Sequence, residues 1–264
     1  LGGTAYNYSA TAIGKPFDGF LSAGGSLNYS ILPVPGDYTI NAIASVEGTD
    51  VRYFGGTNIV QPGDFAGVVI RATTTSSLSA TFNINLAPAG VDDVRALLRM
   101  PNTSTIVAVA TVDASPQVTT CMLYSMSQFD LTPDTDFDQD GRRYLHYGAA
   151  SDSSRCDALA ADGTGALFVG GMLNLPNTDL MAVARVTAAG QNDANYGAGG
   201  VALFNTRALF GPTYDERVFA LGVQNGRAIA AGPSAPVASP TPANTDMAIV
   251  RLTDDERLFV GDFE

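Results

Sequence analysis

The chain has 264 residues, of which 45% are hydrophobic and only 15% charged, so it can build a core and is not disordered by composition. Its 26 acidic and 14 basic residues give a net charge of −12, and a chain this acidic repels phosphate backbones, which excludes nucleic acid as a partner. No stretch approaches the roughly eighteen apolar residues of a membrane span, so we expect no transmembrane segment.

Residues 1–88 alternate apolar and polar side chains between Gly and Pro turns, as in 36–43 and 77–86. This alternation is the period of half-buried strands, and about seven short strands at this spacing predict an antiparallel β-sandwich. The segment 62–86 resembles the last strands of bacterial immunoglobulin-like modules. The resemblance implies an immunoglobulin-like N-terminal domain, which a linker at 86–90 separates from the rest.

An internal repeat occupies residues 91–264. An Ala-Leu pair begins at residues 96, 158 and 220, a spacing of 62 residues each time. Each pair is followed by a turn and an apolar strand, at 105–110, 166–171 and 227–232. A fixed period of this length predicts a repeat architecture in which each unit is one supersecondary element.

Two further elements recur in these units. A Thr-Asp pair precedes a strand that carries an arginine, and an Asp-x-x-aromatic turn ends in glycine. Together the elements resemble the delta-60 repeat family, and the residues that carry the resemblance are Asp193, Tyr196, Gly197, Gly200, Thr245, Asp246 and Arg251. The first unit departs from the pattern, with Met126 in the place of Arg185 and Asp138 in the place of Gly197. The resemblance implies β-propeller-type blades and a secreted bacterial protein, and no particular activity.

We therefore expect an all-β fold: an N-terminal β-sandwich over 1–88, followed over 91–264 by about three propeller-like four-stranded blades and a C-terminal tail. Propellers close with about four to eight blades, so this propeller would be incomplete or non-closed. Three solutions remain open: the blades form a compact stack, the sandwich covers the open side, or the chain associates with copies of itself.

The ends of the chain and its composition indicate a compartment. The sequence begins at Leu1 rather than Met, which is typical of a processed precursor, and residues 257–264 resemble the tails of secreted gammaproteobacterial proteins of the Xanthomonas and Lysobacter type. With 28 glycines and few helix-forming surface residues, the chain favours exposed β-structure. We expect a secreted or extracellular protein of a Gram-negative cell surface.

Asp136, Asp138 and Asp140, followed by Gly141, are the candidate metal ligands. Alternating carboxylates before a glycine can wrap around Ca²⁺, although the twelfth position is Tyr147, which excludes an EF-hand. The corresponding turn of the next unit has no carboxylate at residues 195–200, so the turn itself forms without metal. Bound Ca²⁺ and an acidic surface turn both remain open; we expect no other cofactor.

The two cysteines and the single histidine complete the candidates. Cys121 and Cys156 fall at positions that are apolar in other units, and we expect a disulfide between them in an oxidising compartment; the alternative is two buried thiols. His146 aligns with Asn205 at an ordinary strand end, and no hydrolase or zinc-protease motif accompanies it.

No convergent catalytic set is recognisable, so we expect no enzyme and no catalytic residue. The predicted function is a non-enzymatic secreted or cell-surface module with a structural, adhesive or assembly role, which binds a protein partner or itself. The alternative is an accessory module that binds a glycan or Ca²⁺ for a larger extracellular machine. A third possibility is an enzyme that uses carboxylates such as Asp136 and Asp138.

Overall fold

The structure is a computed structural model that describes residues 2–7, 13–21, 27–31, 37–73, 78–86, 90–115, 118–176, 178–205, 213–236, 246–252 and 258–260. The chain divides into two compact units: unit 1 comprises residues 1–116 and 124–134, and unit 2 comprises 117–123 and 135–264. Thr245 and most of the tail at 257–264, on which part of the sequence interpretation depends, lie outside the described residues.

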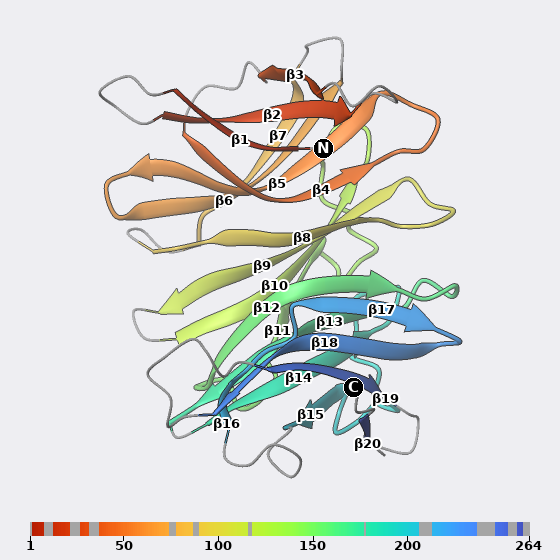
Figure 1. Cartoon of the computed structure of the whole chain (residues 1–264). Helices are drawn as coiled ribbons and strands as arrows, with labels where there is room; N and C mark the ends of the chain where they lie inside the picture. Colours follow the sequence, from red (N-terminus) through yellow and green to blue (C-terminus); the bar gives the residue numbers. More distant parts are fainter. Residues whose placement is uncertain are drawn as a thin grey trace. The chain divides into compact units, whose positions relative to one another are not determined.

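Every regular element in the described residues is a β-strand, which confirms the all-β fold (Figure 1). None of the described residues belongs to a helix that could cross a membrane. The strands are β1 (Gly2–Asn7), β2 (Ile13–Leu21), β3 (Leu27–Ile31), β4 (Tyr38–Ser45), β5 (Val51–Gln61), β6 (Asp64–Thr73), β7 (Leu78–Ile84), β8 (Asp93–Arg99), β9 (Thr105–Ser115), β10 (Val118–Ser127), β11 (Arg142–Leu145), β12 (Ser153–Ala161), β13 (Leu167–Leu175), β14 (Thr178–Val186), β15 (Val201–Phe204), β16 (Thr213–Glu216), β17 (Ala220–Gln224), β18 (Arg227–Pro236), β19 (Asp246–Leu252) and β20 (Leu258–Val260).

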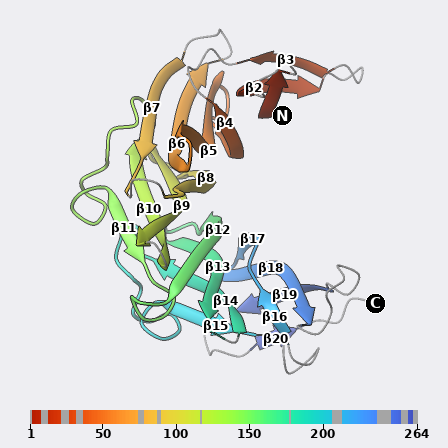
Figure 2. The same ribbon diagram turned by 90° about the vertical axis from the view of Figure 1, so that its left-hand side faces the viewer.

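The strands form meanders in which chain neighbours pair. The first sheet has the order β1-β2-β3, and three four-stranded sheets follow with the orders β4-β5-β6-β7, β11-β10-β9-β8 and β12-β13-β14-β15. The last sheet has the order β16-β18-β19-β20, with β17 also paired to β18 (Figures 1 and 2). Repeated antiparallel sheets of this kind confirm the propeller-like blades that the sequence predicts.

The described residues of 91–264 form the three expected blade-like sheets, and a fourth lies before them. The additional one is β4 to β7, which lies in the region where the sequence predicts a sandwich. Its first strand carries Ile40-Asn41-Ala42-Ile43, and the pairing of this strand matches that of Val94-Arg95-Ala96-Leu97 in β8. The sequence comparison missed this repeat because it lies 54 residues before its neighbour instead of 62 and has Ala-Ile where the others have Ala-Leu.

A β-bulge marks the first strand of the repeats. The register shifts between Ile40 and Ala42 in β4, between Val94 and Ala96 in β8, and between Cys156 and Ala158 in β12, so Asn41, Arg95 and Asp157 are the extra residues. In the last sheet, the amide of Phe219 donates to the carbonyl of Ala231 (2.9 Å), and the alignment places Phe219 at the same position. A bulge redirects the side chain of its extra residue and increases the local twist.

A glycine opposite the bulge allows the two strands to approach closely. In three of the sheets a Cβ added at this glycine would overlap a backbone carbonyl oxygen of the first strand, whereas the corresponding residue of the β8 and β9 pair is Ala110. The glycine and the residue that carries the oxygen are Gly56 and Thr39, Gly171 and Arg155, and Gly232 and Arg217. This shared contact shows that residues 217–220 of the last sheet correspond to the bulged segments of the others.

Neighbouring sheets within each unit pack through one recurring contact. In unit 1, a Cβ on Gly55 would lie 2.7 Å from Cγ1 of Val94. In unit 2, a Cβ on Gly170 would lie 2.6 Å from Cγ1 of Val218. Each valine immediately precedes a bulge residue, so close packing of the sheets fixes the backbone from which the bulge side chain extends.

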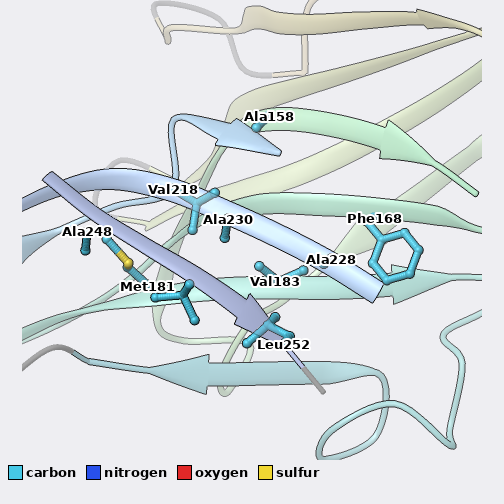
Figure 3. Close-up of a cluster of buried hydrophobic side chains, with 10 residues drawn as sticks. Ala158, Phe168, Met181, Val183, Val218, Ala228, Ala230, Ala248 and Leu252 are labelled. Atoms are coloured by element: carbon cyan, nitrogen blue, oxygen red, sulfur yellow. The ribbon is translucent and has the colours of Figure 1, made fainter. Parts of the chain in front are cut away.

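The core of unit 2 lies between its two sheets. Side chains from β12, β13 and β14 meet side chains from β18 and β19 around the buried Val218 (Figure 3). The members are Ala158, Phe168, Met181, Val183, Val218, Ala228, Ala230, Ala248, Val250 and Leu252. In unit 1, a smaller cluster covers one face of β4 to β6 and comprises Tyr38, Phe54, Val68, Ile70 and Ala72. The alternation seen in the sequence thus corresponds to these buried faces.

The predicted Asp-x-x-aromatic turn recurs with the same geometry. The amide of Gly141 donates to the carbonyl of Phe137, and the amide of Gly200 donates to that of Tyr196, both at 2.8 Å. Asp138 takes a positive φ of 47°, close to the 53° of Gly197. The replacement of glycine by aspartate is tolerated because aspartate adopts left-handed geometry more readily than most residues.

Candidate functional site

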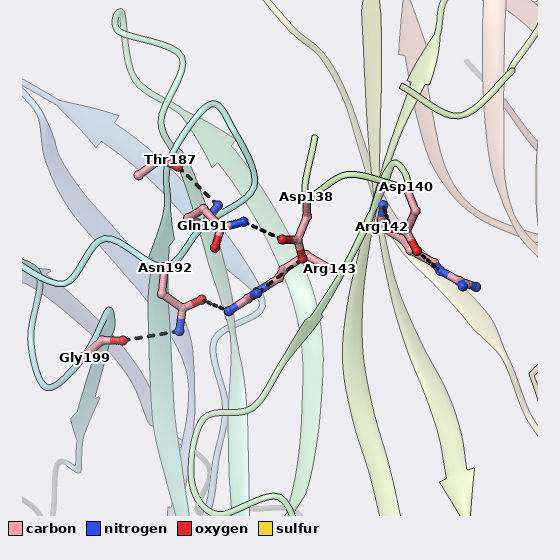
Figure 4. A network of polar contacts seen from close by, with 8 residues as sticks. All are labelled: Asp138, Asp140, Arg142, Arg143, Thr187, Gln191, Asn192 and Gly199. Carbon is pink, nitrogen blue, oxygen red and sulfur yellow. Dashed lines mark hydrogen bonds and ion pairs between the residues drawn. The ribbon is translucent and has the colours of Figure 1, made fainter. Parts of the chain in front are cut away.

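The acidic turn at 136–141 is held by ion pairs and hydrogen bonds (Figure 4). The carboxylate of Asp138 lies 3.2 Å from Nη1 of Arg143 and accepts a hydrogen bond from the side-chain amide of Gln191. The backbone amide of Asp138 donates to the carbonyl of Ala189 (3.0 Å). Asp138 therefore joins its own turn to the corresponding loop of the next repeat.

The three carboxylates of this turn do not converge. Asp140 pairs with Nε of Arg142 at 2.6 Å, and both side chains are half exposed. Asp136 is exposed. Among the described residues, no group of three or more His, Cys, Asp or Glu side chains is arranged to hold a metal ion. The arginines occupy the carboxylates that Ca²⁺ would need, and Ca²⁺ binding at Asp136, Asp138 and Asp140 stays a prediction.

Cys121 and Cys156 are free thiols in this structure, and the disulfide between them stays a prediction. Both are fully buried, and their thiols contact one another. Burial raises the pKa of the Cys121 thiol well above its usual range, and the neighbouring Cys156 raises it further. Thiols in this environment are inert and pack as small apolar side chains, which is the alternative that the repeat alignment also allows.

His146 has a structural contact. Its Nδ1 lies 3.2 Å from the hydroxyl of Thr120, which also donates to the carbonyl of Leu145 (3.4 Å). Thr120 lies on β10, and the contact secures the end of β11 to that strand. Among the described residues, His146 belongs to no group of three or more His, Cys, Asp or Glu side chains that could hold a metal ion.

A cluster of charged and aromatic side chains gathers at the bulges of unit 2. We call Arg155, Asp157, Arg217 and Phe219 the bulge site. Nε of Arg155 and Nε of Arg217 each lie 3.4 Å from an oxygen of Asp157, on opposite oxygens of the carboxylate. The guanidinium carbon of Arg217 lies 3.9 Å from the ring centroid of Phe219. A buried carboxylate thus anchors two arginines, one of which stacks on an aromatic ring.

Exposure differs sharply within the bulge site. The side chain of Asp157 is only 2% exposed, whereas that of Arg155 is 37% exposed. Phe219 is 45% exposed, although its neighbour in the chain, Val218, is fully buried. Because β12 and β17 are in contact (Figures 1 and 2), the two bulges present these side chains on one surface. The buried carboxylate serves as an anchor, and the arginine and the ring are accessible to a ligand.

The corresponding positions in unit 1 also form a polar cluster, but with different charges. Asp93 takes the position of Arg217, and Asn41 takes that of Asp157. The carboxylate of Asp93 accepts hydrogen bonds from Asn41 (2.6 Å) and Thr57 (2.5 Å) and lies 3.0 Å from Nη1 of Arg95. The polar cluster at the bulges is therefore a feature of the repeat, but its chemistry differs between the units.

Sequence reasoning missed the bulge site. The alignment already placed Cys156 with Val94 and Val218, so the next residue in each unit, Asp157, Arg95 and Phe219, was the available signal. In a regular strand, the neighbours of a buried residue point to the opposite face of the sheet. The sequence pattern alone therefore does not predict that these neighbours contact residues of the next sheet. The arginine of the Thr-Asp strand is instead structural, because Arg185 pairs with Asp162 (3.1 Å) and Asp193 (2.8 Å).

The fold and these clusters define an all-β protein of propeller-like sheets with polar side chains at the bulges of its first strands. No protein-family model matches the sequence, and no curated protein matches it. Among solved structures, the chain is similar to a GH43 β-1,3-galactosidase (12% identity, TM-score 0.46, covering 85% of this chain and 46% of that one). It is also similar to a GH32 β-fructofuranosidase of Bombyx mori in complex with sucrose (12% identity, TM-score 0.45, covering 99% and 59%). A third is an exo-1,5-α-L-arabinanase from a bovine ruminal metagenomic library (10% identity, TM-score 0.30, covering 88% and 99%).

These findings correct the functional expectation. The three proteins are named as sugar-acting enzymes, which contradicts a structural, adhesive or assembly module and agrees with the alternative of a glycan-binding module. They also leave the expected lack of enzymatic activity without support. The chain spans about half the length of the first two proteins, 46% and 59%, and identities of 10–12% relate the folds alone, so no reaction is carried over.

Proposed function

We propose that this chain is a glycan-binding module and that the bulge site of unit 2 is its binding surface. The observation that carries the proposal is the exposed ring of Phe219, stacked against Arg217 beside a buried carboxylate that also anchors Arg155. Phe219 is 45% exposed, so part of the ring can be reached by a ligand.

The chemistry of the bulge site suits a sugar. A pyranose ring has an apolar face of C–H groups that can lie against an aromatic ring, and a rim of hydroxyls that needs donors and acceptors. Phe219 offers the ring, and guanidinium groups offer donors in a fixed planar fork. Recognition of this kind needs a few precisely oriented polar groups around an apolar platform, and the residues of the bulge site supply both.

The bulge site is also preorganised. Asp157 orients both guanidinium groups, and the sheet contact of Gly170 with Val218 holds the backbone next to Phe219. Side chains that are positioned by packing and by neighbouring ion pairs lose little freedom when a ligand binds, which favours affinity.

The finer assignments belong with this proposal. The 62-residue spacing and the matching turns at 137–141 and 196–200 support a delta-60-type repeat, and we propose that the chain is secreted from a bacterium as an accessory part of a larger extracellular machine. A protein partner would then position the module on its glycan substrate. Secretion can be tested by following the full precursor in its host's culture medium.

The test of glycan binding is calorimetry or a glycan array with the wild-type chain and two phenylalanine variants. We expect Phe219→Ala to weaken binding about tenfold or more, because the platform is lost. The matched control is Phe129→Ala, since Phe129 is also exposed (64%) but lies in unit 1. Binding that is equal in both variants, or the absence of binding to any glycan, would contradict the proposal.

A further inference from the structure

The charges of the bulge site identify the class of glycan. Its charged residues are two arginines and one aspartate, in a chain whose net charge is −12. A surplus guanidinium on an acidic protein creates a local positive potential, and its natural complement is an anionic group. From these side chains we infer that the bulge site binds an anionic sugar, one that carries a carboxylate or a sulfate; this inference rests on the proposed function.

The geometry assigns the anionic group to Arg155. Within the described part of the chain, the recorded bond of Arg155 is made by Nε, which donates to Oδ1 of Asp157 at 3.4 Å. The side chain is 37% exposed, so a ligand can reach part of it. A guanidinium that is fixed at Nε presents its two terminal nitrogens as a fork, which matches the two oxygens of a carboxylate or sulfate.

The carboxylate of Asp157 is not the anion that occupies the exposed side of Arg155. Its side chain is 2% exposed, so its single charge is used inside the protein. It aligns the arginines and offsets part of their charge. Arg217 is held over one face of the Phe219 ring, with its guanidinium carbon 3.9 Å from the centroid, so a sugar would have to use the remaining exposed part of the ring. Arg155, which shares the carboxylate of Asp157 with Arg217, is the arginine we assign to the charged substituent.

The polar cluster of unit 1 supplies a contrast within the same chain. There Asp93 and Arg95 balance one another, with the neutral Asn41 and Thr57 as the other partners, and no surplus cation is present among these four residues. The same backbone position can therefore carry a neutral polar cluster. The surplus arginine is specific to unit 2, where the exposed ring lies beside it.

The experiment compares three trisaccharides by calorimetry. One is trigalacturonate, the second is the same trisaccharide with each carboxylate reduced to a hydroxymethyl group, and the third is a sulfated form of the neutral one. Short ligands limit the general repulsion from the acidic chain. We expect at least one anionic form to bind about tenfold or more tightly than the neutral form, and the better of the two identifies the anionic group.

Arg155→Gln should abolish this preference, because it should weaken binding of the anionic trisaccharide about tenfold more than binding of the neutral one. Arg155→Lys should restore part of the preference, because it returns the charge without the fork. The melting temperature of each variant checks that the unit is folded, and Arg155→Lys preserves the charge opposite Asp157 if Arg155→Gln is unstable. Equal binding of neutral and anionic forms by the wild-type chain would overturn the inference and leave the proposed function intact. If no form binds, and Phe219→Ala changes nothing, both fail.

Discussion

Nε of Arg217 lies 3.4 Å from Oδ2 of Asp157, which joins the segment before β17 to the bulge of β12. Arg155 approaches the other oxygen of the same carboxylate at the same distance. Because Asp157 is buried and both arginines depend on it, this carboxylate holds the bulge site together. Its removal should affect stability as well as binding.

Asp157→Asn should destabilise unit 2 by about 2 kcal/mol, because it removes the charge that compensates two partly buried guanidinium groups. Urea unfolding measures the change. The control is Asp140→Asn, whose carboxylate pairs with Arg142 on the surface with both side chains 49% exposed, and which should change stability by less than about 0.5 kcal/mol. Equal effects of the two substitutions would show that Asp157 is not a structural anchor.

Gly171→Ala should be among the most damaging single substitutions in the chain. The added methyl group would overlap the carbonyl oxygen of Arg155, so the two strands would have to separate, at a cost of about 3 kcal/mol or more. Gly163→Ala is the matched control, since a Cβ there meets nothing within 4 Å. Thermal unfolding of both variants tests the prediction, and a mild effect of Gly171→Ala would place the bulge elsewhere.

Asp162 should contribute stability to the folded protein that is lost in acid. Burial alone raises the pKa of this carboxyl, but hydrogen bonds from Thr164, Arg185 and the amide of Ala166 together outweigh burial and lower the pKa below its usual value. A lowered pKa in the folded state contributes stability that is present above the unfolded pKa and is lost as the pH falls through the folded pKa.

Unfolding measured from pH 6 down to about pH 2 should therefore show a steeper loss of stability for the wild-type chain than for Asp162→Asn. Asp136→Asn serves as the comparison, because Asp136 is exposed on the surface of a turn. Parallel pH profiles for the wild-type chain and Asp162→Asn would contradict this assignment.

The two cysteines should be unreactive in the native protein. A thiol reagent such as Ellman's should label neither Cys121 nor Cys156 at neutral pH, because both thiols are buried and inaccessible to the reagent. Both should react once the chain is unfolded in denaturant without reductant. If no thiol appears on unfolding until a reductant is added, the disulfide predicted from the sequence is present after all.

Removal of calcium should leave the melting temperature unchanged. The carboxylates of Asp138 and Asp140 are paired with Arg143 and Arg142, which supply positive charge at the turn without a metal. Thermal unfolding with EDTA and with added Ca²⁺ tests this directly, with Asp138→Asn as a variant that should lower stability in both conditions. A melting temperature that falls only with EDTA would support Ca²⁺ binding at Asp136, Asp138 and Asp140.

Much of the fold could be predicted from the sequence, because its signals are local. Alternating strands and a 62-residue period identify an all-β chain of repeated sheets, and the turns at Gly141 and Gly200 follow from their spacing. The fourth sheet, β4 to β7, escaped because its repeat differs in length and lacks the shared turn. This sheet is recognised as a repeat by the β-bulge at Asn41 in the pairing of β4 with β5, and not by a sequence motif.

The candidate site, in contrast, depends on the tertiary structure. The sequence by itself determined the class of fold, the acidic and lysine-poor surface, and the apolar positions that became the core. Only the tertiary structure decided that Asp157, Arg217 and Phe219 meet, because residues 60 apart approach one another through a bulge and a close contact between sheets. The local alternation of apolar and polar residues indicates which side chains are buried. Which strands of different sheets come into contact depends on how whole sheets pack against one another.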